Sequence, residues 1–343
     1  MVVVIAVRSE SVFGAKLLLL TASVCACGRY GFDAHGGPGG AGDDANGDGA
    51  TDGPASDVSG DGAAATGWTV FSPAPTTTTV LTSVVGLGAT DWWIGGTGPE
   101  VYHFDGTAWT ARPGPTTNIQ MMWEQSATDV WETGLNCDVR RWNGATWTAS
   151  PPTGCSADSY LAIGGISATD LWLAGSFGNL EHLVGATWTA LPQGNNIDLW
   201  SAWAASTNDV YVSGTKGSIR HWTGSMATED ITQNLTVSTV WGASANDVWA
   251  VGATGIIYHK VNQGAWTQVT SPTTQFLYGL WGTAANDIWA VGDNATILHY
   301  DGSQWSSGVV PGIPATTSLR WVHGIPGDGV RAVGTGGVVL THP

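Results

Sequence analysis

From Trp68 to the end of the chain, short apolar stretches alternate with glycine-containing turns. A three-residue step of Asp, an apolar residue and an aromatic residue begins one such stretch in each copy of a repeat. Successive copies are 38, 41, 39, 38, 40 and 42 residues apart, and the last copy, Gly329–Gly334, is degenerate. A period of about 40 residues with short alternating apolar runs is typical of propeller blades. The six regular steps are Asp91–Trp93, Asp129–Trp131, Asp170–Trp172, Asp209–Tyr211, Asp247–Trp249 and Asp287–Trp289.

Each copy divides into four predicted strands. In the clearest copy the first three are Leu277–Trp281, Ile288–Gly292 and Thr296–Tyr300, and the fourth begins at Trp305. The Asp before each second strand suits a turn, because a short carboxylate accepts hydrogen bonds from nearby backbone N–H groups. Asp-Gly or Asn-Gly between the third and fourth strands predicts a tight hairpin. This signal occurs at Asp105, Asn143 and Asp301.

The two ends of the repeat array complement each other. Trp68–Phe71 reads as a fourth strand with no first three before it, and Val338–Thr341 reads as a third strand with no fourth after it. Together they complete one blade, and closing the ring in this way removes free sheet edges. We therefore predict an all-β, seven-bladed propeller over residues 67–343, with four-stranded blades and an N-terminal strand that completes the last blade.

The first 66 residues differ in composition from the repeats. Residues 1–27 combine basic residues, a short apolar run and small residues, which indicates an export signal. The ending Val24–Cys27 resembles the bacterial lipobox, which implies that Cys27 is diacylated; a signal peptide that is simply cleaved is the alternative. Residues 28–66 are rich in Gly, Asp and Ala, which predicts a flexible linker. Two stretches of this segment resemble the start of a calcium-binding loop. Both lack the acidic residue that binds the ion from position twelve of such a loop, which favours a solvated linker.

Charge and composition exclude some functions. Acidic residues outnumber basic ones 27 to 11, and this formal net charge of −16 excludes a nucleic-acid-binding surface. No apolar run reaches the roughly 18 residues of a membrane span, so we expect membrane contact through the lipid anchor only. The domain is expected to be a monomer without metal or cofactor.

Two cysteines remain after export, Cys137 and Cys155. In the predicted hairpin Asn143 pairs with Thr146, so the numbers of paired residues in these two strands add up to 289. Cys137 is therefore expected opposite Pro152, at the end of blade two. Pro152 is expected to end the fourth strand, and Cys155 then lies three residues into the connecting loop. Because an exported domain meets an oxidising compartment, we predict a disulfide between these two residues.

The recurrent His and Trp residues are of types found in metal sites and ligand sites, but their regular spacing favours a structural role. His103, His182, His221, His259 and His299 occupy one repeat position on the third strand. Equivalent positions in different blades are kept apart by whole strands, so they cannot converge on one metal. We predict a repeated structural hydrogen bond for them and core packing for the Trp residues of the first and second strands. The sequence contains no G-x-S-x-G, Walker or HExxH motif.

The turn His299–Trp305 and its copies, which end in Trp109, Trp147, Trp188 and Trp266, resemble the Asp-box or BNR-type propellers. That group includes sialidase-like domains and photosystem-assembly-factor-like repeats, and the resemblance covers residues 68–343. The copies have His or Arg where the box has Ser or Thr, and their Asp and Gly are adjacent. The resemblance implies a β-propeller fold for residues 68–343. A sialidase-type activity would need converging arginines, and only Arg320 lies on a predicted first strand.

Function is expected where a repeat departs from its own pattern. The seventh copy reads Arg320-Trp321-Val322-His323 where others have a small residue, an apolar residue, Trp and Gly, and the second copy has Glu124 at a small position. First strands line the axis of a propeller, so Arg320, Trp321, His323 and Glu124 are the candidate ligand-binding residues near the channel mouth. Drift of degenerate repeats is the alternative.

The sequence thus favours a non-catalytic, surface-anchored propeller lipoprotein, exported to the cell envelope, that binds a protein or a glycan on one propeller face. The alternatives are an envelope or periplasmic assembly factor that binds a client protein, and a sialidase-like enzyme that acts on glycans. Fold class alone does not choose among these partners.

The lipobox makes a direct prediction about Cys27. Two acyl chains give stable attachment to a membrane, whereas the propeller itself is soluble. Cys27→Ser should therefore move the protein from the membrane fraction to the soluble fraction, and the native chain should incorporate labelled fatty acid. A variant that still sediments with membranes, beside a native chain without label, would contradict the lipobox.

Overall fold

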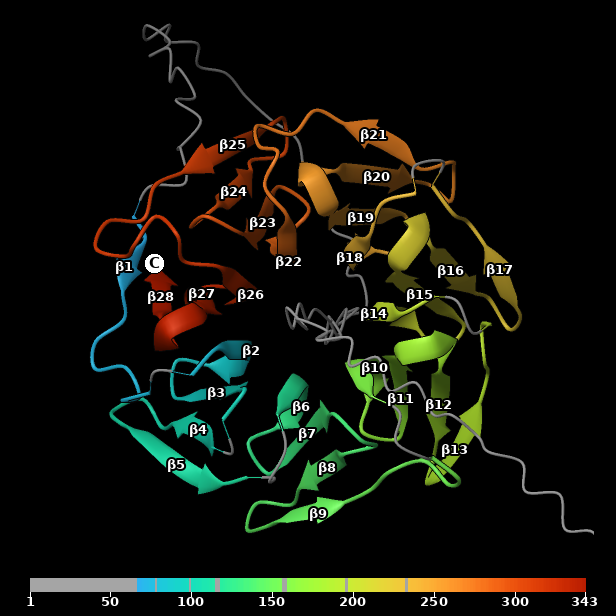
Figure 1. The fold of residues 1–343 in the computed structure, drawn as a ribbon, viewed down its shortest axis with the longest axis horizontal. Helices are drawn as coiled ribbons and strands as arrows, with labels where there is room; N and C mark the ends of the chain where they lie inside the picture. Colours follow the sequence, from blue (N-terminus) through green and yellow to red (C-terminus); the bar gives the residue numbers. More distant parts are fainter. Residues whose placement is uncertain are drawn as a thin grey trace, which may run out of the picture.

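The repeated apolar runs form antiparallel strands, and each repeat forms one sheet. The computed structural model describes residues 67–343 apart from 78, 99, 115–117, 156–158, 195–196 and 232–233. In this part of the chain, 28 strands form seven four-stranded sheets arranged as a ring (Figure 1). The predicted all-β, seven-bladed propeller is confirmed. The predicted signal, Cys27 and the linker fall within residues 1–66, outside the described residues.

Blades are numbered in chain order, and each is given from its innermost strand outward. Blade 1 contains β2 (Leu81–Gly88), β3 (Asp91–Gly96), β4 (Glu100–Phe104) and β5 (Trp109–Pro113). Blade 2 contains β6 (Ile119–Ser126), β7 (Asp129–Gly134), β8 (Val139–Trp142) and β9 (Trp147–Ala149). Blade 3 contains β10 (Tyr160–Ser167), β11 (Asp170–Gly175), β12 (Leu180–Val184) and β13 (Thr187–Ala190). Blade 4 contains β14 (Leu199–Ser206), β15 (Asp209–Gly214), β16 (Ile219–Trp222) and β17 (Met226–Thr228).

The remaining blades follow the same order. Blade 5 contains β18 (Val237–Ser244), β19 (Asp247–Gly252), β20 (Ile257–Val261) and β21 (Thr267–Val269). Blade 6 contains β22 (Leu277–Ala284), β23 (Asp287–Gly292), β24 (Ile297–Tyr300) and β25 (Trp305–Gly308). Blade 7 contains β26 (Leu319–Ile325), β27 (Gly329–Gly334), β28 (Val339–His342) and β1 (Thr69–Val70). Short 3₁₀ turns link the second and third strands at η1 (Ser176–Gly178), η2 (Thr215–Gly217), η3 (Ala253–Gly255) and η4 (Thr335–Gly337).

The second strand of every blade is the most apolar element. Each has one half-buried residue followed by five buried ones, because neighbouring sheets cover both of its faces. Each also ends in Gly; a Cβ on Gly292 would lie 2.1 Å from the carbonyl oxygen of Phe276, where the chain enters β22, the innermost strand of the same blade. The predicted core role of the recurrent Trp residues is confirmed, since these side chains are buried: Trp123, Trp131, Trp172, Trp203, Trp241, Trp249, Trp281 and Trp289.

The recurrent His residues form the predicted structural hydrogen bond, and their partner is the recurrent Asp. In five blades the His Nε2 lies 2.6–2.9 Å from the Asp Oδ1, and the imidazole packs against the aromatic residue two positions after that Asp. Blade 2 has Arg141 instead, which donates two 2.7 Å hydrogen bonds to Asp129 and lies over the Trp131 ring. The Asp was expected to bond to the backbone of its turn; instead it joins the second strand to the third.

The hairpins between third and fourth strands form where they were predicted. The N–H of Asp105 donates to the carbonyl of Ala108, and Gly106 adopts a φ of 92° inside the turn. The Asp105 carboxylate accepts hydrogen bonds from the N–H groups of Thr107 and Ala108, both 2.9 Å long. Asn143 and Asp301 do the same in blades 2 and 6, which explains the Asp or Asn before each Gly.

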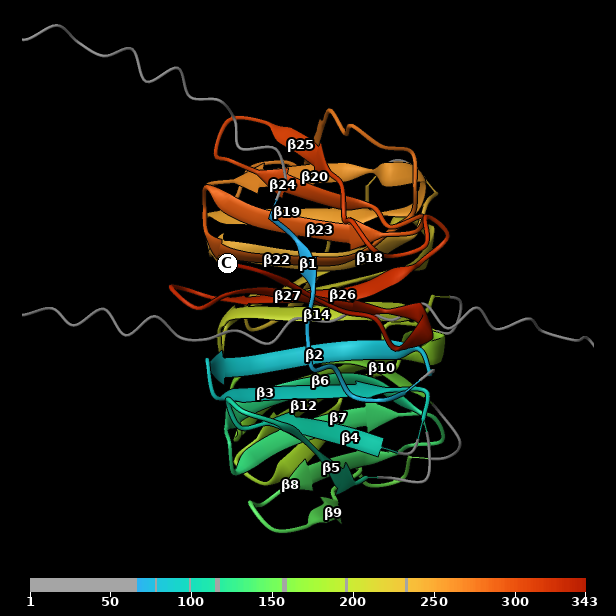
Figure 2. The same cartoon turned by 90° about the vertical axis from the view of Figure 1, so that its left-hand side faces the viewer.

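The N-terminal strand closes the ring as predicted. In β1, Thr69 pairs with Thr341 and Val70 with Leu340, and the Phe71 N–H donates to the Val339 carbonyl at 2.9 Å. Figure 2 views the ring from the side on which β1 lies. The side chains on either side of β1 pack against blades 6 and 1, the two neighbours of blade 7. The Trp68 ring meets Trp289 of blade 6 edge-on at 5.3 Å, and the Phe71 ring meets Phe104 of blade 1 at 5.4 Å.

This closure predicts a sharp difference between two truncations. Removal of residues 1–66 leaves β1 in place and should hardly change stability. Removal of residues 1–74 exposes the edge of β28 together with the surfaces that Trp68 and Phe71 cover, so it should lower the melting temperature and promote aggregation. Equal melting temperatures and equal solubility of the two proteins would contradict the observed closure.

Candidate functional site

The structure corrects the alignment of the seventh repeat by one residue. Trp321 pairs with Val333 as Gly279 pairs with Val291, so Trp321 occupies a position that is Gly in blade 6. His323 pairs with Arg331 and therefore stands where other blades have the recurrent Trp of the first strand. The aromatic character of both residues made the two registers hard to distinguish from the sequence.

The four sequence-predicted residues are buried and do not form one cluster. Their exposed fractions are 4% for Glu124, 8% for Arg320, 0% for Trp321 and 2% for His323. His323 lies between blades: its Nε2–H donates to the Gly86 carbonyl at 3.1 Å, and its ring stacks on Trp281 at 4.2 Å. Burial lowers the pKa of His323 to about 3, so this imidazole is neutral. Trp321 and His323 thus pack between blades 6, 7 and 1.

Arg320 lies in a different environment, beside aromatic rings of other blades. Its guanidinium carbon is 4.3 Å from the centroid of the Tyr278 ring, which stacks on Phe276 at 4.5 Å. Phe276 in turn contacts the half-buried Trp200 of blade 4, at a centroid distance of 6.1 Å. We call Trp200, Phe276, Tyr278 and Arg320 the mouth cluster. A blade 4 ring reaches blade 6 in this cluster, past the innermost strand of blade 5.

Polar contacts hold the mouth cluster in place. The Tyr278 hydroxyl donates to Asp293 Oδ2 at 3.1 Å, and the Ser318 hydroxyl donates to Asp293 Oδ1 at 2.5 Å. Asp293 belongs to the turn between β23 and β24, so the cluster lies at the end of the channel that carries the turns between second and third strands. The sequence analysis missed Trp200 and Tyr278. Their signal was present, since both occupy the same position of the innermost strand as Arg320.

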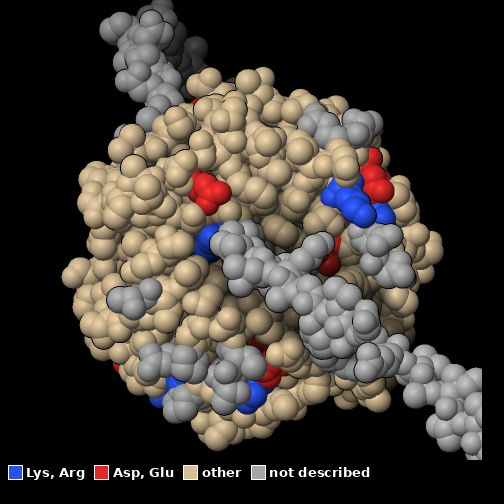
Figure 3. All heavy atoms as spheres, in the orientation of Figure 1, with Lys and Arg blue, Asp and Glu red and all other residues tan. Residues whose placement is uncertain are grey.

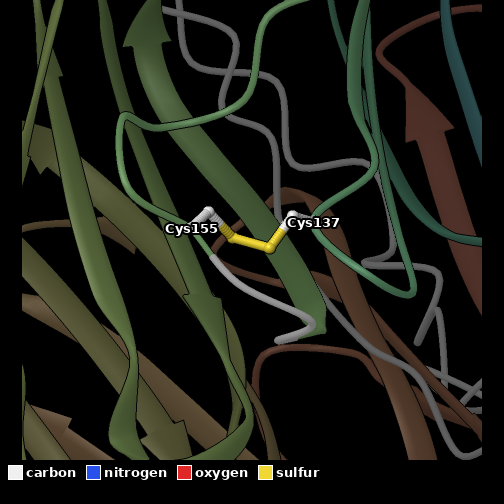
Figure 4. Close-up of a disulfide and its surroundings, with 2 residues drawn as sticks. All are labelled: Cys137 and Cys155. Carbon is white, nitrogen blue, oxygen red and sulfur yellow. A yellow bond between two sulfur atoms is a disulfide. The ribbon is translucent and has the colours of Figure 1, made fainter.

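The predicted cysteine pair lies on this same face of the ring. The structure joins Cys137 and Cys155 with a Cα–Cα distance of 6.0 Å (Figure 4). Cys137 stands where the equivalent turns of blades 3, 4, 5 and 7 have Gly, and a Cβ on Gly255 of blade 5 would lie 2.1 Å from the Thr273 carbonyl oxygen of the following loop. Gly178 and Gly337 approach the backbone of the loop after the outermost strand equally closely. In blade 2 a disulfide replaces that close backbone contact.

Glu124 is a buried carboxyl at the boundary of blades 1 and 2. It occupies a position that is Gly86 in blade 1 and Gly282 in blade 6. Burial, and after it the negative charge of Asp91, raise the pKa of Glu124 well above its usual value. Glu132 on β7 is buried too, and burial also raises its pKa. Among the described residues no group of three or more His, Cys, Asp or Glu side chains could hold a metal ion.

Comparison with solved structures places the chain in the class of seven-bladed propellers. The structure of YCF48 bound to D1 peptide is similar, with a TM-score of 0.66 and 16% identity over 80% of this chain and 96% of that one. YCF48 from Cyanidioschyzon merolae gives a TM-score of 0.64 at 15% identity, over 80% and 98% of the two chains. The WD40 propeller domain of Doa1 gives 0.68 at 12% identity, over 81% and 97%. Neither a protein-family model nor a curated protein sequence matches the chain.

The raised pKa of Glu124 predicts a pH-dependent stability. The folded protein binds the Glu124 proton more tightly than the unfolded chain does. This carboxyl therefore favours folding below its unfolded pKa of 4.5, and the contribution is lost as the pH rises towards the folded pKa. Glu124→Gln mimics the protonated form, so it should raise the melting temperature at about pH 8 and change it little at about pH 4. A difference between variant and native protein that is the same at both pH values would contradict a buried, proton-retaining Glu124.

Proposed function

We propose that this protein is a non-catalytic, envelope-anchored propeller that binds a polypeptide segment at the mouth cluster. The observation that carries the proposal is the arrangement of Trp200, Phe276, Tyr278 and Arg320 at one end of the channel. Trp, Tyr and Arg are the residues most enriched among those that dominate the binding energy of protein interfaces. Trp200 and Phe276 are only half-buried, so their rings remain accessible to a partner.

The surroundings of the mouth cluster suit a polypeptide better than a polyanion. The visible part of this face carries few charged side chains (Figure 3). The exposed Phe177 lies at the tip of η1, a turn between second and third strands and so on the same face, and adds apolar surface for an interface. One of the similar structures holds a bound peptide, which supports a propeller of this shape as a peptide receptor. Attachment through Cys27 would keep the domain at the envelope. In the described residues, no helix is long and apolar enough to cross a membrane.

Peptide display against the purified protein tests this function. Selected peptides should bind the native protein, and Trp200→Ala or Arg320→Ala should weaken that binding by about 10-fold or more, since truncation of a central anchor costs about 2 kcal/mol. Phe177→Ala, which removes an aromatic ring of the same face outside the mouth cluster, is the matched control and should have a smaller effect.

Two outcomes would contradict the proposal. Selected peptides that bind native protein and Trp200→Ala equally well would exclude the mouth cluster as their site. Turnover of a glycoside or sialoside that is lost in Arg320→Ala would support the sialidase-like alternative in its place.

A further inference from the structure

A second candidate site lies at the outer rim of the ring, between blades 4 and 5. A pocket of about 560 Å³ opens there between the segment that follows β17 and the hairpin that joins β20 to β21. This volume is within the roughly 300–1,000 Å³ of typical ligand pockets. Its polar and aromatic lining comprises Glu229, Asp230, Tyr258, Lys260, Gln263 and Trp266.

Lys260 departs from the repeat at this pocket. It pairs with Val248 on β19, and it is buried, with 5% of its surface exposed. A buried ammonium group is costly unless it has a charged partner, so its presence is not explained by packing. The corresponding residues of the other blades are mostly large and apolar or aromatic: Phe104, Trp142, Leu183, Trp222, Tyr300 and His342.

Glu229 of blade 4 is the partner of Lys260, and it departs from the repeat as well. The Lys260 ammonium donates to Glu229 Oε2 at 2.5 Å, and the Trp266 indole N–H donates to the same oxygen at 3.1 Å. Glu229 Oε1 lies 3.0 Å from Nδ1 of His221. The matching residue of blade 2 is Ser150, whose backbone carbonyl accepts the Trp188 indole N–H in the equivalent bond. Two departures from the repeat therefore face each other across one blade boundary.

The charged side chains at the pocket are paired with one another. Burial opposes ionisation of Glu229, but hydrogen bonds from His221 and Lys260 outweigh it and lower the pKa to about 2. Asp230 is paired in the same way with Arg220 of β16. The pocket consequently offers hydrogen-bond donors and acceptors without a net charge that would select an ionic ligand.

The lining combines these polar groups with aromatic rings. Trp266 and Tyr258 contribute ring surface. The Gln263 amide accepts from the Tyr211 hydroxyl at 3.0 Å and donates to the Ala245 carbonyl at 2.6 Å, which leaves one N–H and one lone pair for a ligand. The ammonium of Lys260 has three donors, so its contact with Glu229 leaves it the capacity to bind a ligand oxygen. A ring with apolar C–H faces and hydroxyl groups at its edge matches both features, because aromatic side chains supply apolar contact area and the polar groups fix orientation.

We propose that the pocket between blades 4 and 5 binds a neutral saccharide unit. Trp266 provides the stacking surface, and Glu229, Asp230, Lys260 and Gln263 bond to the hydroxyl groups. This site is separate from the mouth cluster and does not depend on the function proposed there.

A printed array of neutral, sialylated and sulfated oligosaccharides, followed by calorimetry with the best neutral probe, tests the proposal. Native protein should prefer neutral probes. Trp266→Phe should weaken binding by about 10-fold, whereas Trp188→Phe is the matched control, because it removes the equivalent indole bond in blade 3 and should leave affinity unchanged. Gln263→Ala should also weaken binding, and it should lower the melting temperature slightly, because it removes the acceptor of the buried Tyr211 hydroxyl.

Several results would overturn this assignment. They are the absence of binding to every neutral probe at millimolar concentration, a preference for sialylated or sulfated probes, and equal affinities of Trp266→Phe and Trp188→Phe. Trp200→Ala distinguishes the two sites, since it should weaken peptide binding by about 10-fold or more and leave saccharide binding intact. Failure of one proposal therefore leaves the other testable.

Discussion

Ring closure is the constraint on which the rest of this structure depends. Every blade uses its neighbours to cover both faces of its second strand, so an open array would expose two apolar sheet faces and two edges. Hydroxyl groups on innermost strands join adjacent blades around the axis. The Thr82 hydroxyl donates to the Ile119 carbonyl at 2.8 Å, and the Ser238 hydroxyl donates to the Leu277 carbonyl at 2.6 Å. β1 supplies the last connection.

The closing blade replaces the recurrent Asp–His pair with a cation. Gly329 stands at the Asp position and Thr341 at the His position, so β27 and β28 lack that polar link. Arg331 on β27 instead lies 4.1 Å from the centroid of Trp92 and 4.6 Å from that of Phe71. Its pKa falls to about 10 through burial, which leaves it charged at neutral pH. One guanidinium thus connects blade 7, blade 1 and the N-terminal segment, where stacking on rings of both contributes to closure.

The fold was predictable because its signals are local and repeated. The spacing of the Asp–aromatic steps, the hairpin residues and the remnant strand at Trp68 all indicated the same architecture. The partner of each His was not predictable, because the Asp–His bond joins residues on adjacent strands and depends on their register. The mouth cluster and the pocket between blades 4 and 5 could not be predicted from the sequence for a related reason. Trp200 and Phe276, like Glu229 and Lys260, come from different blades and meet only after the ring has closed.

Blade 2 departs from the repeat in two ways that have opposite effects on stability. Glu124 and Glu132 place two buried carboxyls near the boundary with blade 1, where a small apolar cluster around Trp93 and Met122 is separate from the main core. Buried carboxyls weaken folding at neutral pH, because they retain a proton that the unfolded chain releases. The disulfide of the same blade acts in the opposite direction. The pair closes a short loop, with a sequence separation of 18. The chain-entropy treatment gives about 3 kcal/mol for a loop of this size. The covalent link thus lies in the blade that carries the buried Glu124 and Glu132, and it offsets part of their cost.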